Sequence, residues 1–269
     1  MRPILFAIGT QFVYSYTVMI AVGVLLALGL SWRRVGQRPT LSQSKWPYTT
    51  LQSTWFDAVL IMLAAGLVCG RIGFVIGAWN YFQIHPDEAW QLWQGGFSYH
   101  GALVGGLGAL LVYSAVSSQN SVVCKYLGLF APGFALLVAF GWAGCWLDGC
   151  AYGQETTLGW LAADLPDAYG VYAIRYQTQV GGMLTGLLAL LLPWLLGRVW
   201  RVWQRPLRLF GLTLLLVSLG HLLVGLGRGD GLPLLWGWSV GLWLDGLLAL
   251  AGFVAMFFGS LEIQRVEEA

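Results

Sequence analysis

The segment FDAVLIMLAAGLVCGRIGFVIGA, residues 56–78, decides the fold of this chain. Its only charged residues are Asp57 and Arg71. A helix of about 20 predominantly apolar residues crosses a hydrocarbon core of about 30 Å. The segment therefore predicts a helix that spans a membrane.

Further apolar runs of this kind lie at residues 12–31, 98–117, 126–146, 179–197, 208–227 and 236–259. The first run is too long for the apolar core of a signal peptide. It leads into SWRRVGQR instead of a small-residue cleavage site. We therefore expect an all-α membrane protein, a bundle of about seven transmembrane helices that forms a single integral membrane domain over residues 1–269.

The composition excludes a soluble protein. Residues are 58% hydrophobic and 10% charged, and the mean hydropathy is +0.70, whereas soluble domains are roughly 25% charged. A net charge of +2 is too small to indicate a nucleic-acid partner. No nucleotide-binding fingerprint or serine-hydrolase elbow is present, and the small-residue run GALVGGLG is typical of a helix packing face.

Basic residues orient the bundle, because lysine and arginine are enriched in cytoplasmic loops. If the spans alternate, most of them fall on one side of the membrane: Arg33, Arg34, Arg38, Lys45, Lys125, Arg198, Arg201, Arg205, Arg208 and Arg265. We expect this side to be cytoplasmic, with the N-terminus outside and the C-terminus in the cytoplasm.

Two segments on the outer side are long enough to carry structure of their own. Residues 79–97 are rich in tryptophan and contain no lysine or arginine, which predicts an amphipathic arm at the membrane interface. Residues 147–178 are polar enough to form a small external cap.

Ionisable side chains inside a membrane are costly, so each one is a candidate site residue. They are Asp57, Arg71, His100, Asp148, His221, Arg228, Asp230 and Asp245, and most lie toward the outer ends of the spans. This pattern favours one polar chamber that opens outward. The structural alternative is that Arg71 snorkels, that Arg228 pairs with Asp230 or Asp245, and that His100 bonds to a neighbouring helix.

The four cysteines lie in or beside apolar runs, and only Cys145 and Cys150 are close in sequence. A spacing of five places them on different faces of a helix. We therefore expect small buried thiols instead of a disulfide or a metal-binding pair.

Residues 70–106, GRIGFVIGAWNYFQIHPDEAWQLWQGGFSYHGALVGG, resemble the prolipoprotein diacylglyceryl transferases, in which an arginine-containing span leads through an interfacial arm to a GG-x-S-[FY]-HGG-like signature. The segment GWAGCWLDGCAYG, residues 141–153, is similar to a glycine-framed segment of that family. Weaker matches follow in the family's order: RYQTQV at 175–180, RPLRLFGL at 205–212, GLGRGDG at 225–231 and WSVG at 238–241.

The resemblance implies a multi-pass protein of the bacterial plasma (inner) membrane. It implies an enzyme that moves the diacylglyceryl group of phosphatidylglycerol to the lipobox cysteine thiol in the signal peptide of a preprolipoprotein, with the release of glycerol phosphate. Its partners would be these two substrates and membrane lipid, and it would use no cofactor or metal.

The resemblance also implies roles for individual residues. His100 would activate the thiol or bind the headgroup, because a free thiol with a pKa near 8.5 is mostly protonated. Arg71 and Arg228 would bind the phosphate leaving group. Gly95, Gly96 and Gly101 would let the backbone approach the headgroup. The remaining substrate-binding candidates are Ser98, Gly144, Asp148, Gly149, Tyr152 and Gly153.

The chain departs from the family pattern at several positions. Trp142 stands where the family has an arginine regarded as essential, His221 stands where span six of the family has another, and Gly225 replaces a nearby glutamate. An indole cannot form a bidentate charged bond to phosphate. Arg175 is therefore a candidate replacement, and His221 could serve only when protonated. Smaller departures are Ala102, Tyr176 and Gln177.

Two functions of different classes follow from these departures. The first is an active but divergent diacylglyceryl transferase. The second is a catalytically degenerate family member that acts as a lipid-binding or lipoprotein-associated membrane protein. An unrelated channel or carrier with seven spans is a third reading, although the sequence contains no inverted repeat.

Overall fold

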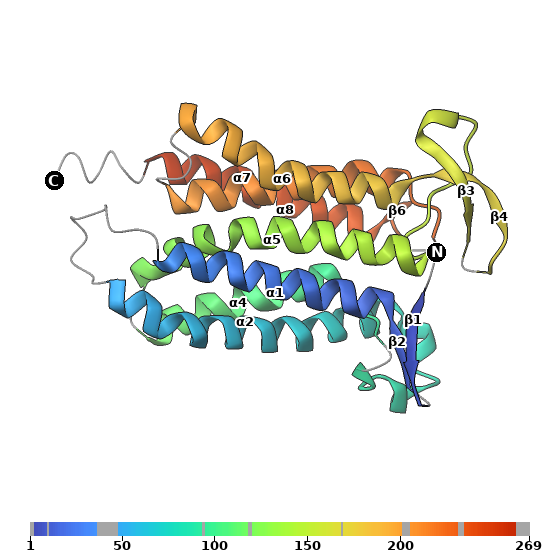
Figure 1. Ribbon diagram of the computed structural model, residues 1–269, viewed down its shortest axis with the longest axis horizontal. Helices are drawn as coiled ribbons and strands as arrows, with labels where there is room; N and C mark the ends of the chain where they lie inside the picture. Colours follow the sequence, from blue (N-terminus) through green and yellow to red (C-terminus); the bar gives the residue numbers. More distant parts are fainter. Residues whose placement is uncertain are drawn as a thin grey trace. The chain divides into compact units, whose positions relative to one another are not determined.

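The computed structural model of the protein describes residues 3–9, 11–36, 48–92, 95–117, 120–167, 169–200, 205–230 and 234–261. Its long helices are α1 Ser15–Gly36, α2 Tyr48–Gly77, α4 Tyr99–Val116, α5 Asn120–Asp148, α6 Thr178–Trp200, α7 Pro206–Leu226 and α8 Val240–Leu261 (Figure 1). Seven helices of the described residues are long and apolar enough to cross a membrane. The predicted fold class is therefore confirmed.

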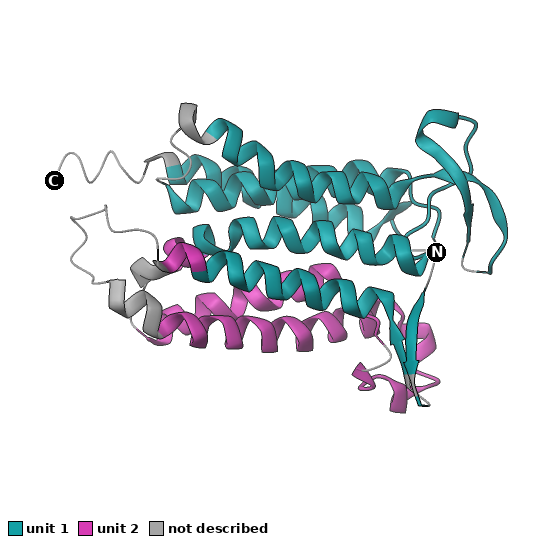
Figure 2. Cartoon of the chain, in the orientation of Figure 1, with its two compact units in different colours: residues 1–32, 127–269 teal, residues 33–126 magenta. Residues whose placement is uncertain are grey.

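The chain divides into two compact units (Figure 2). Unit 1 comprises Met1–Trp32 and Leu127–Ala269, and unit 2 comprises Arg33–Tyr126. Most of α1 and α5 and all of α6, α7 and α8 belong to unit 1, whereas α2 and α4 belong to unit 2. The single membrane domain expected from the sequence stays a prediction.

In unit 2, glycines of α4 lie directly against α2. A Cβ atom added at Gly101 would meet the carbonyl oxygen of Cys69, and one at Gly105 would meet the Cys69 side chain and the carbonyl oxygen of Ala65. Helices in lipid associate by such close backbone approach, because lipid and side chains are equally apolar. The predicted packing face in GALVGGLG is thus confirmed.

Unit 1 is joined in the same way. Gly186 of α6 lies against Ala139 of α5, Gly220 of α7 lies against Thr185 of α6, and Gly211 of α7 lies against α8. Helices α6, α7 and α8 pack in sequence, and α5 lies against α6 at Gly186 (Figure 1). These helices of unit 1 are therefore joined by close approach of their backbones.

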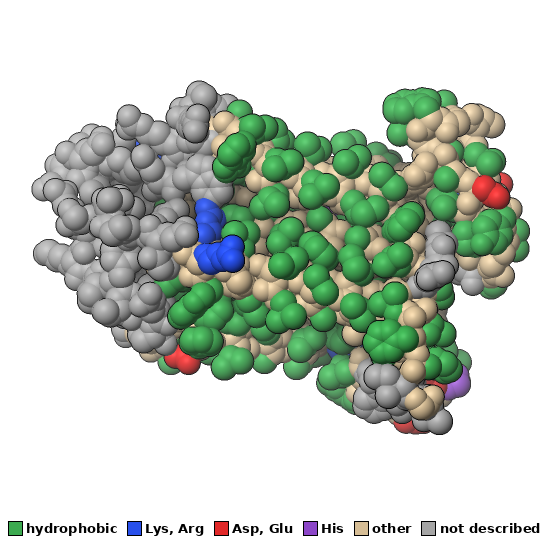
Figure 3. Space-filling model, viewed as in Figure 1, with side chains coloured by type: hydrophobic (Ala, Val, Ile, Leu, Met, Phe, Trp, Pro, Cys, Tyr) green, Lys and Arg blue, Asp and Glu red, His purple; other side chains and the backbone are tan. Residues whose placement is uncertain are grey.

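Large apolar side chains cover the helices on the face visible in Figure 3. Leu25, Leu60, Leu223 and Leu247 are more than 60% exposed. Such a surface is unfavourable in water but suits a lipid environment, where the hydrophobic effect does not oppose its exposure.

The described residues also form three antiparallel two-stranded sheets, which were not expected from the sequence. They are β1 Ile4–Ile8 with β2 Gln11–Tyr14, β3 Ala162–Pro166 with β4 Tyr172–Tyr176, and β5 Leu234–Leu235 with β6 Trp238–Ser239. The first apolar run was expected to begin its helix at residue 12, but Phe12 to Tyr14 form a strand and α1 begins at Ser15. Aromatic and β-branched residues favour strands. A mostly apolar strand shows no alternation of polar and apolar residues, so it could not be told from the start of the apolar helix.

The external segments have short elements of their own. The predicted arm contains α3 Trp79–Phe82 and the 3-10 helix η1 Pro86–Glu88. The predicted cap contains the 3-10 helix η3 Gly159–Leu161 and the β3–β4 hairpin, which extends beyond the helix ends of unit 1 (Figure 1).

The close contact at Gly105 can be tested with a matched pair of variants. Gly105→Ala would place a methyl group against Cys69 and Ala65, whereas Gly108 of the same helix has nothing within 4 Å of its Cβ position. We expect Gly105→Ala to destabilise unit 2 by about 1–3 kcal/mol and Gly108→Ala to be neutral or slightly stabilising. Thermal unfolding in detergent measures the difference, and equal melting temperatures would contradict this packing.

Candidate functional site

His100 lies in the first turn of α4, where the signature segment turns into the helix. Ser98 is the N-cap: its Oγ accepts a hydrogen bond from the Gly101 amide at 3.2 Å, and its own amide donates to the carbonyl of Gly70 at 2.8 Å. The His100 ring is half-buried and packs edge to face on Tyr99 at 5.0 Å. Ser98 therefore fixes the beginning of α4, and with it His100, against α2.

Arg71 of α2 is buried and bonded to backbone carbonyls. Its Nε donates to the Ala89 carbonyl at 2.6 Å and its Nη2 to that of Glu88 at 2.6 Å. Its Nη1 donates to the carbonyls of Gly95 at 2.5 Å and Gly96 at 3.1 Å. The residue is only 2% exposed, so it does not snorkel.

The acceptors of Arg71 explain the paired glycines. Gly95 and Gly96 have φ angles of +78° and +77°, in the left-handed region that favours glycine. Both of their carbonyls bond to Arg71. The ring centroids of Phe74 and Phe82 lie 5.5 and 5.4 Å from the guanidinium carbon of Arg71. We call these contacts of Arg71 the Arg71 clamp, and they hold the end of the arm next to the signature segment.

The clamp predicts a specific effect of Arg71→Lys. A lysine has a compact ammonium group and cannot reproduce the planar fork of a guanidinium, so carbonyls of the arm would lose their partners at about 1–3 kcal/mol each. We expect chymotrypsin to cleave within residues 79–97 at least tenfold faster than in the wild type. Arg33→Lys, at an exposed arginine of the same unit, is the control. Unchanged cleavage in Arg71→Lys would refute the clamp.

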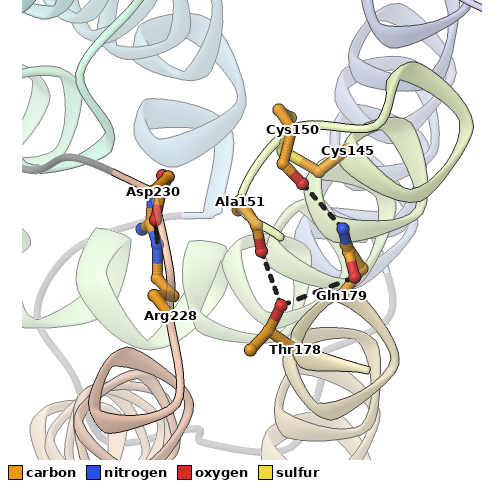
Figure 4. The surroundings of a disulfide bond; sticks show 7 residues. All are labelled: Cys145, Cys150, Ala151, Thr178, Gln179, Arg228 and Asp230. Atoms are coloured by element: carbon orange, nitrogen blue, oxygen red, sulfur yellow. Dashed lines mark hydrogen bonds and ion pairs between the residues drawn. A yellow bond between two sulfur atoms is a disulfide. The ribbon is translucent and has the colours of Figure 1, made fainter. Parts of the chain in front are cut away.

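The segment 141–153 contains a disulfide between Cys145 and Cys150, whose Cα atoms are 4.8 Å apart (Figure 4). The expectation of buried thiols was therefore wrong for this pair. The helical-face argument does not apply to Cys150, because α5 ends at Asp148 and the chain reverses at Gly149, with φ +90°.

Two buried side chains of α6 hold the loop that follows. Thr178 donates its hydroxyl to the Ala151 carbonyl at 2.5 Å, and Gln179 donates its amide to the Cys150 carbonyl at 2.9 Å (Figure 4). Gln179 is fully buried and Thr178 is 5% exposed. The sequence reading did not select either residue, although polar residues at the start of an apolar span were a signal for both.

Arg228 follows the end of α7 and is paired along its backbone with this loop. Gly153 and Arg228 form an isolated β-bridge, and the Gly229 amide donates to the Tyr152 carbonyl at 2.9 Å. The guanidinium forms a bidentate pair with Asp230: its Nε donates to Oδ1 at 2.8 Å, and its Nη2 donates to Oδ2 (Figure 4). The pairing of Arg228 with Asp230, the structural alternative for this residue, is thus confirmed.

Arg175 is the second arginine on this side of unit 1. It is 7% exposed, its Nη2 lies 3.3 Å from both Glu155 and Asp167, and its guanidinium lies 5.4 Å from the Tyr152 ring centroid. Its Nε is buried without a hydrogen-bond partner among the described residues. Arg175 is therefore enclosed and paired with two carboxylates, which offset its charge.

Asp167 organises the turn of the β3–β4 hairpin. Its Oδ1 accepts bonds from the amides of Tyr169 at 2.8 Å and Val171 at 3.0 Å. The bonds from Val171 and Tyr169, together with the Arg175 charge, hold the pKa of Asp167 below its ordinary value, against the opposing effect of desolvation. The ionised carboxylate is thus the form that stabilises the hairpin.

This lowered pKa predicts acid lability of the hairpin. The stabilisation is complete above the ordinary aspartate pKa of about 3.9 and is lost as the pH falls through the lowered value of the folded state. We expect amide exchange in residues 162–176, corrected for intrinsic rates, to accelerate in this range. Asp167→Asn should exchange faster already at neutral pH and respond little to acid. An identical acid response in both proteins would argue against Asp167.

Trp142 and His221 are bonded to each other inside unit 1. The Trp142 Nε1 donates to the His221 Nε2 at 2.9 Å, and the His221 Nδ1 lies 3.7 Å from the Asp245 Oδ1. An indole N–H can only donate, so the Nε2 of His221 carries a lone pair and the imidazole is neutral in this arrangement. His221 in this state supplies no positive charge at the position of the family's arginine.

The other candidates lie around the same loop. Gly144 of α5 packs against Tyr16 and Met19 of α1, Asp148 ends α5, and Gly153 is buried against the Tyr176 carbonyl. Asp148, Gly149, Tyr152, Gly153, Arg175 and Arg228 are thus gathered at one end of unit 1. Arg71, Gly95, Gly96, Ser98, His100 and Gly101 are gathered in unit 2.

The fold defines a multi-pass membrane protein with polar side chains at the helix ends. Residues 3–258 match the sequence model of the prolipoprotein diacylglyceryl transferases. The chain therefore belongs to the prolipoprotein diacylglyceryl transferase family.

Several relatives carry the name phosphatidylglycerol–prolipoprotein diacylglyceryl transferase. The protein of Clostridium tetani is 28% identical over 232 residues, which are 86% of each chain. That of Bacillus licheniformis is 31% identical over 168 residues, 62% of this chain and 58% of the relative. A Clostridium perfringens protein that carries this name with the number 2 is 32% identical over 157 residues, 58% of this chain and 57% of its own.

Proposed function

We propose that the protein transfers the diacylglyceryl group of phosphatidylglycerol to the lipobox cysteine thiol of preprolipoproteins in the bacterial plasma membrane. The observation that carries the proposal is the family match over residues 3–258, together with a signature segment whose His100 is fixed by the Ser98 cap and borders the Arg71 clamp. A pre-organised base on a rigid helix end is what such a transfer requires.

In this reaction His100 acts as the base that accepts the proton of the substrate thiol. The thiolate attacks the glyceryl carbon that bears the phosphate, the carbon–sulfur bond forms and the carbon–oxygen bond to phosphate breaks. Glycerol phosphate leaves with the electron pair of that bond, and the proton held by His100 returns to it or to solvent. A thiol with a pKa near 8.5 is a poor nucleophile until it is deprotonated, so removal of this base should slow the reaction strongly.

The phosphate is assigned to Arg228. Its side chain is 26% exposed and already holds a bidentate carboxylate, and a phosphate presents two oxygens in the same geometry. The headgroup would therefore replace Asp230 on the guanidinium. Arg71 has four backbone acceptors instead, so we assign it a positioning role through the clamp.

Two observations on unit 1 support an outward-facing site. Gly128 of α5 lies against Pro206 of α7, so the end of unit 1 opposite the disulfide carries the neighbouring Arg205 and Arg208. Basic residues mark the cytoplasmic side, and disulfides persist on the oxidising side. We therefore place Cys145–Cys150 and Arg228 on the outer face, with the N-terminus outside and the C-terminus in the cytoplasm.

A reconstituted reaction tests the function. Purified protein in phosphatidylglycerol vesicles is mixed with a lipobox peptide, and mass spectrometry detects the thioether-linked diacylglyceryl peptide. We expect His100→Ala to lower kcat/KM by about 10²–10⁴-fold, the contribution of a general base. His85→Ala, at an exposed histidine of the arm, should react like the wild type.

The proposal fails if the wild type yields no product with phosphatidylglycerol, or if a peptide with serine in place of the lipobox cysteine reacts equally well. It also fails if His100→Ala and His85→Ala have the same rate. The product mass separates diacylglyceryl transfer from acylation of the peptide.

The bond between Trp142 and His221 favours a second candidate, a family member that binds anionic lipid without turnover. The neutral imidazole leaves the position of the family's arginines without a cation. This function predicts saturable phosphatidylglycerol binding with no product. It also predicts a second chain in the same genome with arginines at both positions.

A further inference from the structure

We infer that the Cys145–Cys150 disulfide is a positioning element for Arg228, so that its redox state sets the affinity of the protein for a phospholipid phosphate. The structural half of this inference concerns the backbone of Arg228 alone. The half that concerns phosphate rests on the proposed function.

The disulfide closes a turn that needs external support. Gly149 has φ +90° and Ala151, which carries a side chain, has φ +54°. A non-glycine residue in this region is strained and persists only where its surroundings hold it. The surroundings here are the disulfide on one side and the bonds from Thr178 and Gln179 to the carbonyls of residues 150 and 151 on the other.

The supported turn passes directly into the backbone partner of Arg228. The Gln154 amide donates to the Gly227 carbonyl at 2.8 Å, and the Gln154 side chain donates to the Arg228 carbonyl at 3.0 Å. The Gly229 amide returns a bond to Tyr152 at 2.9 Å. Residues 152–154 thus hold Arg228 on both sides, two residues after α7 has ended.

Close contact adds to these bonds. A Cβ atom at Gly229 would meet the carbonyl oxygen of Gly153, and one at Gly153 would overlap the carbonyl oxygen of Tyr176. The loop therefore fits between the end of α7 and the end of β4 with no space for another side chain. A shift of the loop is transmitted to Arg228, because packed backbones cannot absorb it.

The position of the disulfide favours a local role. It joins residues only five apart, and the chain entropy removed by a cross-link falls as the closed loop becomes shorter. Its loss should therefore leave the helices of unit 1 folded and release mainly the turn. Cys145 and Cys150 are both partly exposed, so a reductant can reach the bond.

Hydrogen exchange with and without the disulfide tests the structural half. We compare the wild type, Cys145→Ser/Cys150→Ser, and the control Cys124→Ser, whose cysteine lies outside the disulfide. Loss of the disulfide should accelerate exchange of residues 149–156 and 225–230 at least tenfold, with residues 209–220 of α7 unchanged. Unchanged exchange at 225–230 would overturn the inference. If the double variant does not fold, reduction of the wild type with a phosphine gives the same comparison.

Steady-state kinetics test the phosphate half, with a phosphine reductant because an added thiol would compete with the substrate thiol. We expect reduction to raise the KM for phosphatidylglycerol about tenfold with kcat within twofold, and reoxidation to restore it. Faster exchange with an unchanged KM would overturn the link to phosphate. Faster exchange in a protein that makes no product in either redox state would support the positioning of Arg228 and reject the proposed function.

Discussion

Buried backbone groups that leave a helix need a hydrogen-bond partner inside the protein, and this requirement governs the loops beside the candidate site residues of each unit. A buried carbonyl without a hydrogen-bond partner is costly. The arm of unit 2 returns its carbonyls to Arg71. The turn after α5 gives its carbonyls to Thr178 and Gln179. In both places buried polar side chains of a span hold irregular backbone next to candidate site residues.

Hydrogen bonding also changes how the candidate arginines are interpreted. A guanidinium in a span suggests a ligand site, because its desolvation is costly. Arg71, however, is satisfied by backbone, whereas Arg175 and Arg228 are paired with carboxylates. Of these three, Arg228 is the one to which the proposed function assigns the phosphate, because a phosphate presents two oxygens in the geometry of the Asp230 carboxylate. The proposed function therefore requires an exchange of anions at Arg228 and not an unpaired charge.

Trp142 and His221 stand where the family has arginines, yet each has a polar partner within the protein. An indole donor, an imidazole that accepts on one nitrogen, and a carboxylate next to the other form a chain across three helices. The Trp142–His221 hydrogen bond joins α5 to α7, and Asp245 of α8 lies 3.7 Å from the other imidazole nitrogen. His221 accepts a hydrogen bond on Nε2 in this arrangement, so the proposed function assigns the anionic headgroup to Arg228 and the loop that holds it.

The seven spans could be predicted because hydrophobic length is a local property that needs no tertiary information. The signature around His100 and the family were also readable from local motifs. Strand β2 could not be predicted, because an apolar strand directly before an apolar helix has no hydrophobic pattern that separates the two. The disulfide could not be predicted either, because the argument from helical spacing assumed that α5 continues through Cys150.

The sequence by itself thus determined the class of protein, the seven apolar spans and the candidate site residues. Only the tertiary structure decided the partners of those residues: backbone carbonyls for Arg71, Asp230 for Arg228, and His221 for Trp142. The physical reason is that membrane insertion depends on the summed hydrophobicity of a segment, whereas the role of a buried charge or donor depends on which groups the fold brings within hydrogen-bond distance.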